Sequence, residues 1–216
     1  MFRQFQSSLE ILIRHNLIDK NDIQTLYQNY QLIEKSWQEN FNRIKNVKLV
    51  LLGEAPLRYS SYIYNQSSKD SAFLYKKHLI HCAHKLAIPE PEKLSKLHLL
   101  EHLEILVMDI FPFSFTPEMD FNYRHSRGLR RLNSKKKVRH QDVLKTLFYE
   151  SKAWHLDSKE KLIRRKSNQR TTYVYRYKAC ERLNLEVFTD FKKATIGKSY
   201  DLDKEMFYSF FSDNKS

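Results

Sequence analysis

Apolar side chains follow a helical repeat over the first part of the chain. From Phe2 to Ile13, and more regularly from Ile23 to Ile44, they recur every three or four residues. This spacing places them on one face of a helix. We therefore expect a pair of N-terminal helices. Asp19 or Asn21 is a suitable N-cap for the second, because either side chain accepts hydrogen bonds from a first helical turn.

Two short apolar runs then break the helical pattern, at Lys48–Leu52 and Ile105–Asp109. Each has almost no polar interruption, which is typical of strands buried on both faces. Helical patterns lie between them, at about Ser71–Ala87 and Pro91–His102. A strand, a helical connection and a second strand predict a parallel pair with a right-handed crossover.

The second half of the chain predicts further elements of both kinds. Residues 141–154 have a helical pattern, and residues 171–177 and 185–191 read as strands. Asp201 is a candidate N-cap for a short last helix. Residues 121–141 are polar and basic, and we expect a long surface segment there.

Length and composition favour one folded domain. The chain has 216 residues, of which 41% are hydrophobic and 13% aromatic, which suits a single sizeable core. The patterns together predict an α/β fold, a three-layer α/β/α domain with a central, mostly parallel sheet, preceded by an N-terminal helical pair. We divide this domain into N-terminal helices (1–46), a sheet core (47–200) and a C-terminal helix and tail (201–216).

Positive charge is concentrated in two groups. The net charge is +13 at pH 7. The first group lies in a stretch without acids and comprises Arg124, Arg127, Arg130, Arg131, Lys135, Lys136, Lys137 and Arg139. The second comprises Lys159, Lys161, Arg164, Arg165, Lys166 and Arg170. Such clusters indicate either a surface that binds nucleic acid phosphates or an ordinary solvated basic face.

Other features narrow the class of protein. Cys82 and Cys180 are too few and too far apart to form a metal site, and they suit buried thiols in a reducing compartment. No convincing signal peptide and no membrane-spanning apolar run is present. We expect a cytoplasmic protein with no membrane contact, no cofactor and no bound metal, and the sequence leaves its oligomeric state open.

Both apolar runs deliver a carboxylate at their C-terminal end. Glu54 follows Gly53 after the first, and Asp109 closes the second. Parallel strands end at one edge of a sheet, where ligands of α/β proteins bind, so we expect the two acids to converge on a functional site. Structural roles are the alternative: Glu54 would pair with Arg58 or cap a helix, and Asp109 would accept backbone N–H groups.

The segment Gly53-Glu54-Ala55-Pro56 at the end of a buried strand resembles the first motif of the uracil-DNA glycosylase superfamily, particularly its bacterial and archaeal branch. The resemblance covers residues 48–117. It implies a base flipped out of the stack, held against an aromatic ring and recognised at its edge. Glu54 would be the motif acid and Asp109 would face the base edge. The residues that would contact the base are Gly53, Ala55, Pro56, Tyr62, Tyr64, Phe73 and Phe111, with Tyr62, Tyr64 and Phe73 as candidates for the stacking ring.

Three departures from that family bear on the chemistry. Ala55 stands where the most active branch has a water-orienting Asp. Asp109 stands where the family commonly has Asn, and an ionised carboxylate only accepts hydrogen bonds, so it suits an exocyclic amino group better than a uracil carbonyl. The His-Pro-Ser motif is absent, because no proline follows Pro117.

These observations leave three hypotheses. The first is a divergent base-excision enzyme that uses Glu54 and Asp109. The second is a non-catalytic protein of the same fold that binds DNA or RNA, with DNA as the expected partner. The third is an α/β enzyme whose two carboxylates act on a small ligand or hold a hard cation.

Overall fold

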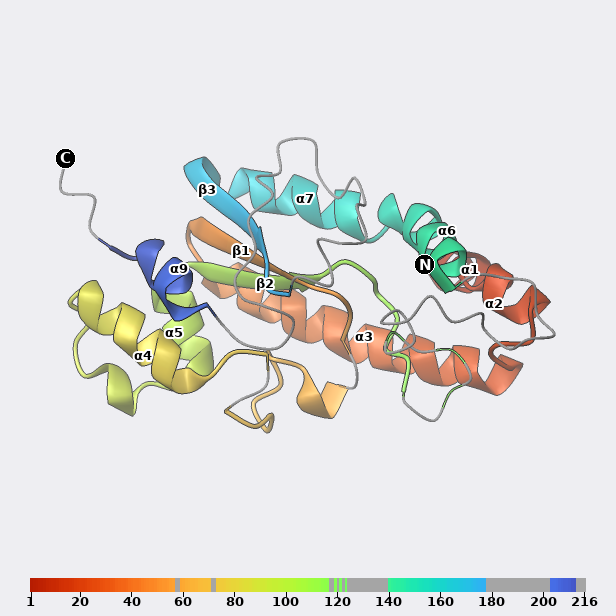
Figure 1. Cartoon of the computed structure of the whole chain (residues 1–216), viewed down its shortest axis with the longest axis horizontal. Coiled ribbons are helices and arrows are strands. Elements are labelled where there is room, and N and C mark those ends of the chain that lie inside the picture. The colour runs from red at the N-terminus through yellow and green to blue at the C-terminus, as the bar shows by residue number, and fades with distance from the viewer. Residues whose placement is uncertain are drawn as a thin grey trace.

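The computed structural model of the chain describes residues 1–56, 59–70, 73–116, 119, 121, 123, 140–177 and 203–212, with the backbone alone at 168–170. It is an α/β fold in which helices surround a parallel sheet, with N-terminal helices preceding the first strand (Figure 1). The predicted fold class is confirmed.

The sheet has three parallel strands in the order β2-β1-β3. They are β1 (Val47–Gly53), β2 (Ile105–Asp109) and β3 (Ser167–Tyr175). Gly53 lies opposite Asp109, and Leu52 lies opposite Tyr175. The carboxyl ends of all three strands therefore meet at one edge of the sheet.

The two central predictions of strand position are confirmed. Strand β2 has the predicted bounds, and β1 extends one residue beyond the prediction at each end. All five residues of β2 and six of the seven in β1 are buried. This burial explains why both strands appear in the sequence as continuous apolar runs rather than as alternating ones.

Two groups of helices cover the sheet. Helices α3 (Lys20–Arg43) and α7 (Leu156–Arg165) precede β1 and β3 and contact each other through side chains described below. The second group comprises α4 (Lys76–Lys85), η2 (Pro91–Lys93) and α5 (Lys96–His102), which lie between β1 and β2 in the sequence. The last helix, α9 (Lys204–Ser209), contacts α4 and completes this group. Helix α3 also contacts α5 and, through Trp37, the outer edge of β2, so it links the two groups.

Helices α1 (Phe2–Ser8) and α2 (Glu10–Arg14) pack against α6 (His140–Lys152), at one end of the molecule (Figure 1). Trp154 Nε1 donates to Ser8 Oγ at 3.1 Å, and Ser8 Oγ donates to the Glu150 carbonyl at 3.0 Å. The first predicted helix is divided in two at Leu9, because the N–H of Leu9 donates to the Gln6 carbonyl, three residues back, at 3.0 Å.

Helix ends follow the capping residues. Asp19 caps α3 in a reciprocal capping box with Asp22, which selects one of the two predicted caps. Ser95 caps α5, so the helix predicted from residue 91 is divided into η2 and α5. Asp203 caps α9, and this replaces the prediction of Asp201, which lies outside the described residues.

Helix α7 was not predicted, because the sequence reads there as a charged stretch. Its buried side chains are Leu156, Lys159 and Ile163, so a lysine occupies a position on the core-facing side. The predicted strand at 185–191 and the basic residues from Arg124 to Arg139 lie outside the described residues. Within the part of the chain that the structure describes, no helix is both long and apolar enough to cross a bilayer.

Candidate functional site

The carboxyl ends of β1 and β2 bring the two predicted acids onto adjacent chain segments. Gly53 and Asp109 are direct partners in the sheet. Beyond them the pairing continues, because Ile110 N–H donates to the Gly53 carbonyl at 3.0 Å and Phe111 N–H donates to the Glu54 carbonyl at 2.9 Å. Glu54 and Asp109 are therefore fixed at the same edge of the sheet.

Gly53 is closely packed on the side where a Cβ atom would project. A Cβ atom at this position would overlap Asp109 Oδ1 and would lie 2.8 Å from Phe73 Cε2. The carboxyl group and the aromatic ring thus both rest on the glycine backbone. The acid that the sequence predicted at the base edge and one of the three predicted stacking rings are therefore neighbours over one backbone position.

Phe73 reaches this place through an uncommon backbone conformation. Its φ is 60°, in the left-handed region that a bulky residue rarely adopts, and such strain tends to persist where surrounding contacts impose it. The Phe73 carbonyl accepts a hydrogen bond of 3.0 Å from Arg176 Nε. The same conformation explains why α4 begins at Lys76 rather than at the predicted Ser71.

Arg176 is a site residue that the sequence did not single out. Its N–H donates to the Leu52 carbonyl at 2.8 Å, which places it directly beyond β3. The side chain is buried, and the guanidinium carbon lies 4.6 Å from the centroid of the Tyr177 ring and 5.8 Å from that of Phe73. The only sequence signal was a single cation inside the aromatic run Tyr173–Tyr177.

Asp109 has an altered acidity. It is 8% exposed, and burial raises its pKa from 3.8 to about 7, although the positive charge of Lys159 acts in the opposite direction. Burial disfavours the charged carboxylate because water no longer solvates it. A neutral carboxyl group is accordingly accessible near physiological pH.

Lys159, on α7, forms a buried ion pair with Glu34. Its Nζ is 2.8 Å from Glu34 Oε2 on α3 and 4.4 Å from the centroid of the Trp37 ring, and its side chain is 5% exposed. Glu34 and Asp109 therefore both interact with the positive charge of Lys159. Lys159 was counted in the second basic group, and only its spacing from Leu156 and Ile163 indicated a buried position.

His155 lies one helical turn before Lys159 and contacts the backbone of Asp109. Its Nε2 is 3.0 Å from the Asp109 carbonyl, and the N–H at this nitrogen donates. Burial, and then the charge of Lys159, hold the pKa of His155 well below its usual value, so the ring is neutral. Its Nδ1 carries the lone pair and has no hydrogen-bond partner among the residues that the structure describes.

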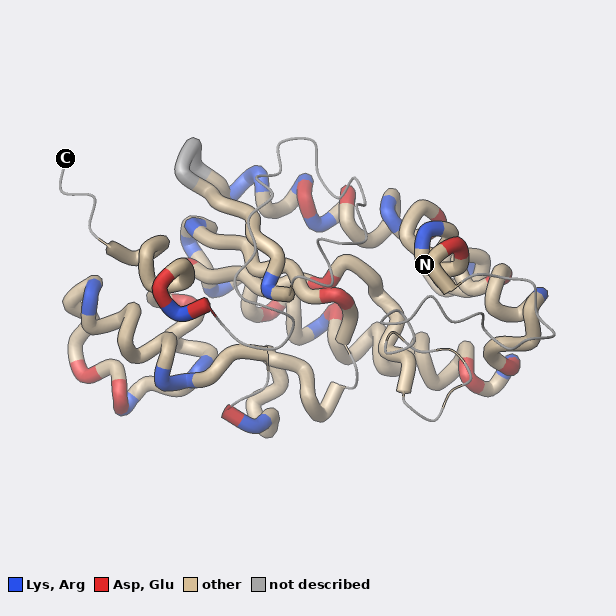
Figure 2. Tube along the Cα trace, viewed as in Figure 1, with Lys and Arg blue, Asp and Glu red and all other residues tan. Residues whose placement is uncertain are grey.

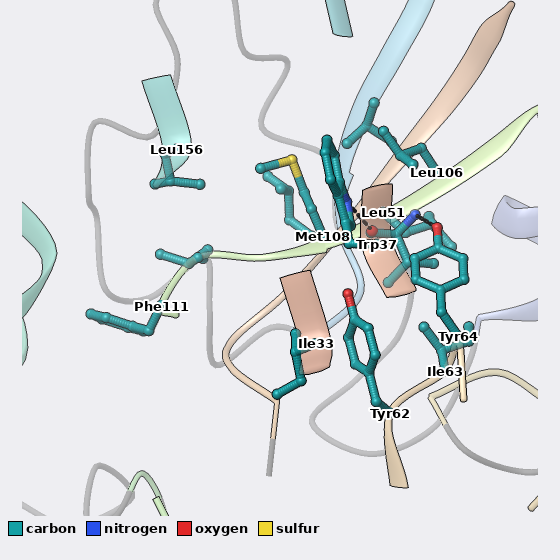
Figure 3. Close-up of a cluster of buried hydrophobic side chains, with 14 of the residues drawn as sticks. Ile33, Trp37, Leu51, Tyr62, Ile63, Tyr64, Leu106, Met108, Phe111 and Leu156 are labelled. Atoms are coloured by element: carbon teal, nitrogen blue, oxygen red, sulfur yellow. Dashed lines mark hydrogen bonds between the residues drawn. The ribbon is translucent and has the colours of Figure 1, made fainter. Parts of the chain in front are cut away.

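Tyr64 and Tyr62, two of the predicted stacking rings, are buried (Figure 3). Tyr64 Oη accepts from Val107 N–H at 2.6 Å, while Trp37 Nε1 donates to the Val107 carbonyl at 3.1 Å. These two side chains satisfy the outward N–H and carbonyl of Val107 on the edge strand β2, where unpaired groups invite pairing with another strand. Burial raises the pKa of Tyr62, and the charge of Asp109 raises it further.

Tyr123 lies within the electrostatic influence of both acids. Its hydroxyl donates to the Phe113 carbonyl at 3.1 Å, and its pKa is raised by burial, then by Glu54 and Asp109. Phe111 is fully buried, with its ring centroid 5.3 Å from that of Tyr123. Of the remaining predicted contacts, Pro56 is buried and Ala55 is half-buried.

The second basic group is partly structural. Lys159 pairs with Glu34, and Arg164 Nη2 lies 2.6 Å from Glu160 Oε1. Lys166 Nζ donates to three carbonyls at the end of α3, those of Phe41, Asn42 and Ile44, at 2.7, 3.1 and 2.7 Å. These three cations have internal partners, which weakens the reading of the group as one phosphate-binding surface.

No protein-family model, no curated protein and no solved structure matches this chain. In the described part of the chain, no cluster of three or more His, Cys, Asp or Glu side chains is arranged to hold a metal ion. The chemistry of the site is therefore inferred from the geometry at the ends of the strands.

Proposed function

We propose that this protein binds an unstacked nucleic acid base at the carboxyl ends of β1 and β2, in the manner of a uracil-DNA-glycosylase-like protein. The observation that carries the proposal is the contact of the Asp109 carboxyl group and the Phe73 ring with the backbone of Gly53. A flipped base needs a stacking surface and a hydrogen-bonding group at its edge, and these two side chains supply both.

The protonation of Asp109 decides which base edge it suits. A neutral carboxyl group donates one hydrogen bond and accepts others, as the amide of Asn does. It therefore matches the adjacent carbonyl and N–H of uracil. The ionised group only accepts, so it favours an exocyclic amino group. With a pKa of about 7, the neutral form prevails below neutral pH.

Phe73 is the stacking ring in this proposal. It is half-buried and contacts Gly53, whereas Tyr62 and Tyr64 are 5% and 3% exposed. Stacking on an aromatic ring is worth about 1–3 kcal/mol per base and is tolerant of sequence. Arg176 holds Phe73 through its carbonyl, so the ring is positioned before a base arrives.

Glu54 is the candidate catalytic group. A carboxylate beside the sugar stabilises positive charge there, or acts as a general base toward water. Ala55 favours the second candidate function, a protein that binds a base without excising it, because a methyl group cannot orient water. In both cases the partner is DNA rather than RNA and the compartment is the cytoplasm, which the buried thiol of Cys82 suits.

Oligonucleotides with one deoxyuridine, single-stranded or in a mismatch, test this function against matched thymidine, cytidine and abasic controls. Affinity and base release are measured at about pH 5.5 and about pH 8.5, on either side of the Asp109 titration. We expect the wild type to prefer deoxyuridine over the abasic control at the lower pH and to lose that preference at the higher pH. Asp109→Asn should keep it at both.

Glu54→Gln separates the enzyme from the binder. If the protein is an enzyme, this variant binds the deoxyuridine strand but no longer releases uracil. If the wild type also binds without release, the non-catalytic candidate stands. Equal affinity for the deoxyuridine and abasic strands at both pH values would overturn base recognition altogether.

A further inference from the structure

Helix α4 carries an exposed row of basic side chains on one side. Its sequence, KKHLIHCAHK, contains no acid, and Figure 2 shows Lys at both of its ends. Lys77, His81 and Lys85 are exposed and recur every four residues, so they lie along one face of the helix. Tyr75, directly before the helix, is 50% exposed.

Aromatic rings lie beside these basic side chains. Lys77 Nζ lies 5.4 Å from the centroid of Tyr75, and Lys85 Nζ lies 5.5 Å from that of Tyr208 on α9. The rings of His81 and Tyr208 have centroids 4.0 Å apart and planes inclined by 33°. We call Tyr75, Lys77, His81, Lys85 and Tyr208 the α4 stripe.

The α4 stripe is held in place from beneath. His78 Nδ1 and Tyr208 Oη are joined by a hydrogen bond of 2.8 Å, which attaches α9 to α4. Burial is the leading cause of the lowered pKa of His78 and of the raised pKa of Tyr208. The stripe is therefore a preformed surface rather than a set of independent side chains.

Nearby acids leave the stripe positive. Glu92 pairs with His84 at 2.6 Å, and Glu90 pairs with Lys93. Glu205, on α9, contributes to the raised pKa of Tyr208, and its neighbour Lys204 carries the opposite charge. The row from Lys77 to Lys85 spans about 12 Å, which matches about three stacked nucleotides.

The stripe begins beside the proposed base site. Tyr75 is two residues beyond Phe73, and Phe73 rests on Gly53. A strand whose base stacks on Phe73 would continue over Tyr75 onto α4. Cations that follow the backbone, alternating with rings on which bases stack, are what proteins use to bind single strands without sequence preference.

We infer that the α4 stripe binds the single-stranded DNA that flanks the base held at Phe73. This inference rests on the proposed function and names the surface that receives the neighbouring nucleotides. Lys77 and Lys85 contact phosphates, and Tyr75 stacks on a base.

The cations are tested by measuring how the affinity for an oligothymidylate of about 12 nucleotides depends on salt, a length within usual site sizes. The variant Lys77→Gln/Lys85→Gln is compared with Lys45→Gln/Lys145→Gln, which removes the same charge from exposed positions outside both basic groups. Each phosphate contact on a single strand contributes about 0.7 to the slope of log K against log salt. We expect the slope to fall by about 1.4 in the first variant and to stay unchanged in the control.

An equal slope in both variants would overturn the assignment of the stripe. The ring has its own test: Tyr75→Ala should weaken binding about fivefold or more, and Tyr75→Phe should restore it. Failure of the proposed function has a different signature, a loss of the pH-dependent preference for deoxyuridine while the slope difference persists.

Discussion

The two ends of the same sheet are built in opposite ways. At the amino end, charge serves the backbone: Lys166 Nζ donates to the last carbonyls of α3, and Val47 N–H donates to the Lys166 carbonyl at 2.7 Å. A cation at the C-terminus of a helix also interacts favourably with the helix dipole. The polar groups at this end have the partners that a stable fold requires.

At the carboxyl end, several local rules are broken within a few residues. Asp109 is buried, Phe73 adopts a left-handed conformation, and Gly53 has no space for a side chain. Such violations are expected at functional sites, where stability is exchanged for a specific arrangement of groups. The comparison therefore supports the proposal that the functional site lies at the carboxyl end.

The largest expected effect comes from a change at the carboxyl end of the sheet. Asp109→Asn should make the folded protein more stable. The folded pKa of Asp109, about 7, exceeds its unfolded value of 3.8, so the folded state holds a proton that the unfolded state has lost. Stability of the wild type should therefore fall as pH rises from about 4 to about 7, and then level off. Asn has no such titration, so the variant should be more stable at about pH 8 by about 2–4 kcal/mol.

Urea denaturation at several pH values measures this difference. Asp142→Asn, at an exposed position on α6, is the matched control and should keep the wild-type pH dependence. A parallel pH dependence for wild type and Asp109→Asn would mean that Asp109 titrates normally.

Gly53→Ala should produce the next largest effect, a loss of about 3 kcal/mol, because the added methyl group overlaps the Asp109 carboxyl and crowds Phe73. The free energy of unfolding is measured in the wild-type background and in an Asp109→Ala background. We expect a smaller cost in the second, since part of the clash is gone. Equal costs would show that the two residues do not touch.

Lys166→Met breaks the amino end instead. Removal of the Lys166 ammonium leaves three carbonyls without this donor, and we expect stability to fall by about 2 kcal/mol. In contrast to Asp109→Asn, we expect a similar loss at about pH 5 and about pH 8, although burial lowers the pKa of Lys166 from its ordinary value. Base binding should be unaffected, so a selective loss of binding would contradict the division of roles between the two ends.

The smallest expected effects are shifts in the pKa of Asp109 when a buried charge near it is removed. Lys159→Met should raise the pKa of Asp109, because it removes a cation that favours the carboxylate. Glu34→Gln should lower it, because Lys159 then has no competing acid. Carboxyl NMR resonances report both shifts, which we expect to be about one pH unit or less. Shifts in the same direction would indicate a general structural response.

The sequence predicted the strands more successfully than the polar groups around them. Strand β2 was recovered with its bounds because its residues are apolar throughout and end at Asp109. Helix α7 was missed because Lys159 occupies a buried position, and only the partner on α3 explains why a lysine is stable there. Pairings across more than a hundred residues leave no trace in local pattern.

The sequence predicted some parts of the candidate site and missed others. The motif at Gly53–Pro56 and the acid at Asp109 identified the two strand ends and three candidate rings. Which ring rests on Gly53 depends on the left-handed conformation of Phe73 and on Arg176, and neither follows from periodicity. The acidity of Asp109 depends on burial by segments far along the chain.

The most direct test is an NMR titration of the Asp109 carboxyl carbon, identified by its loss in Asp109→Asn. We predict a midpoint near pH 7, moving upward when a uracil-containing strand binds the neutral form. A midpoint near pH 4 that is unaffected by the strand would contradict the account.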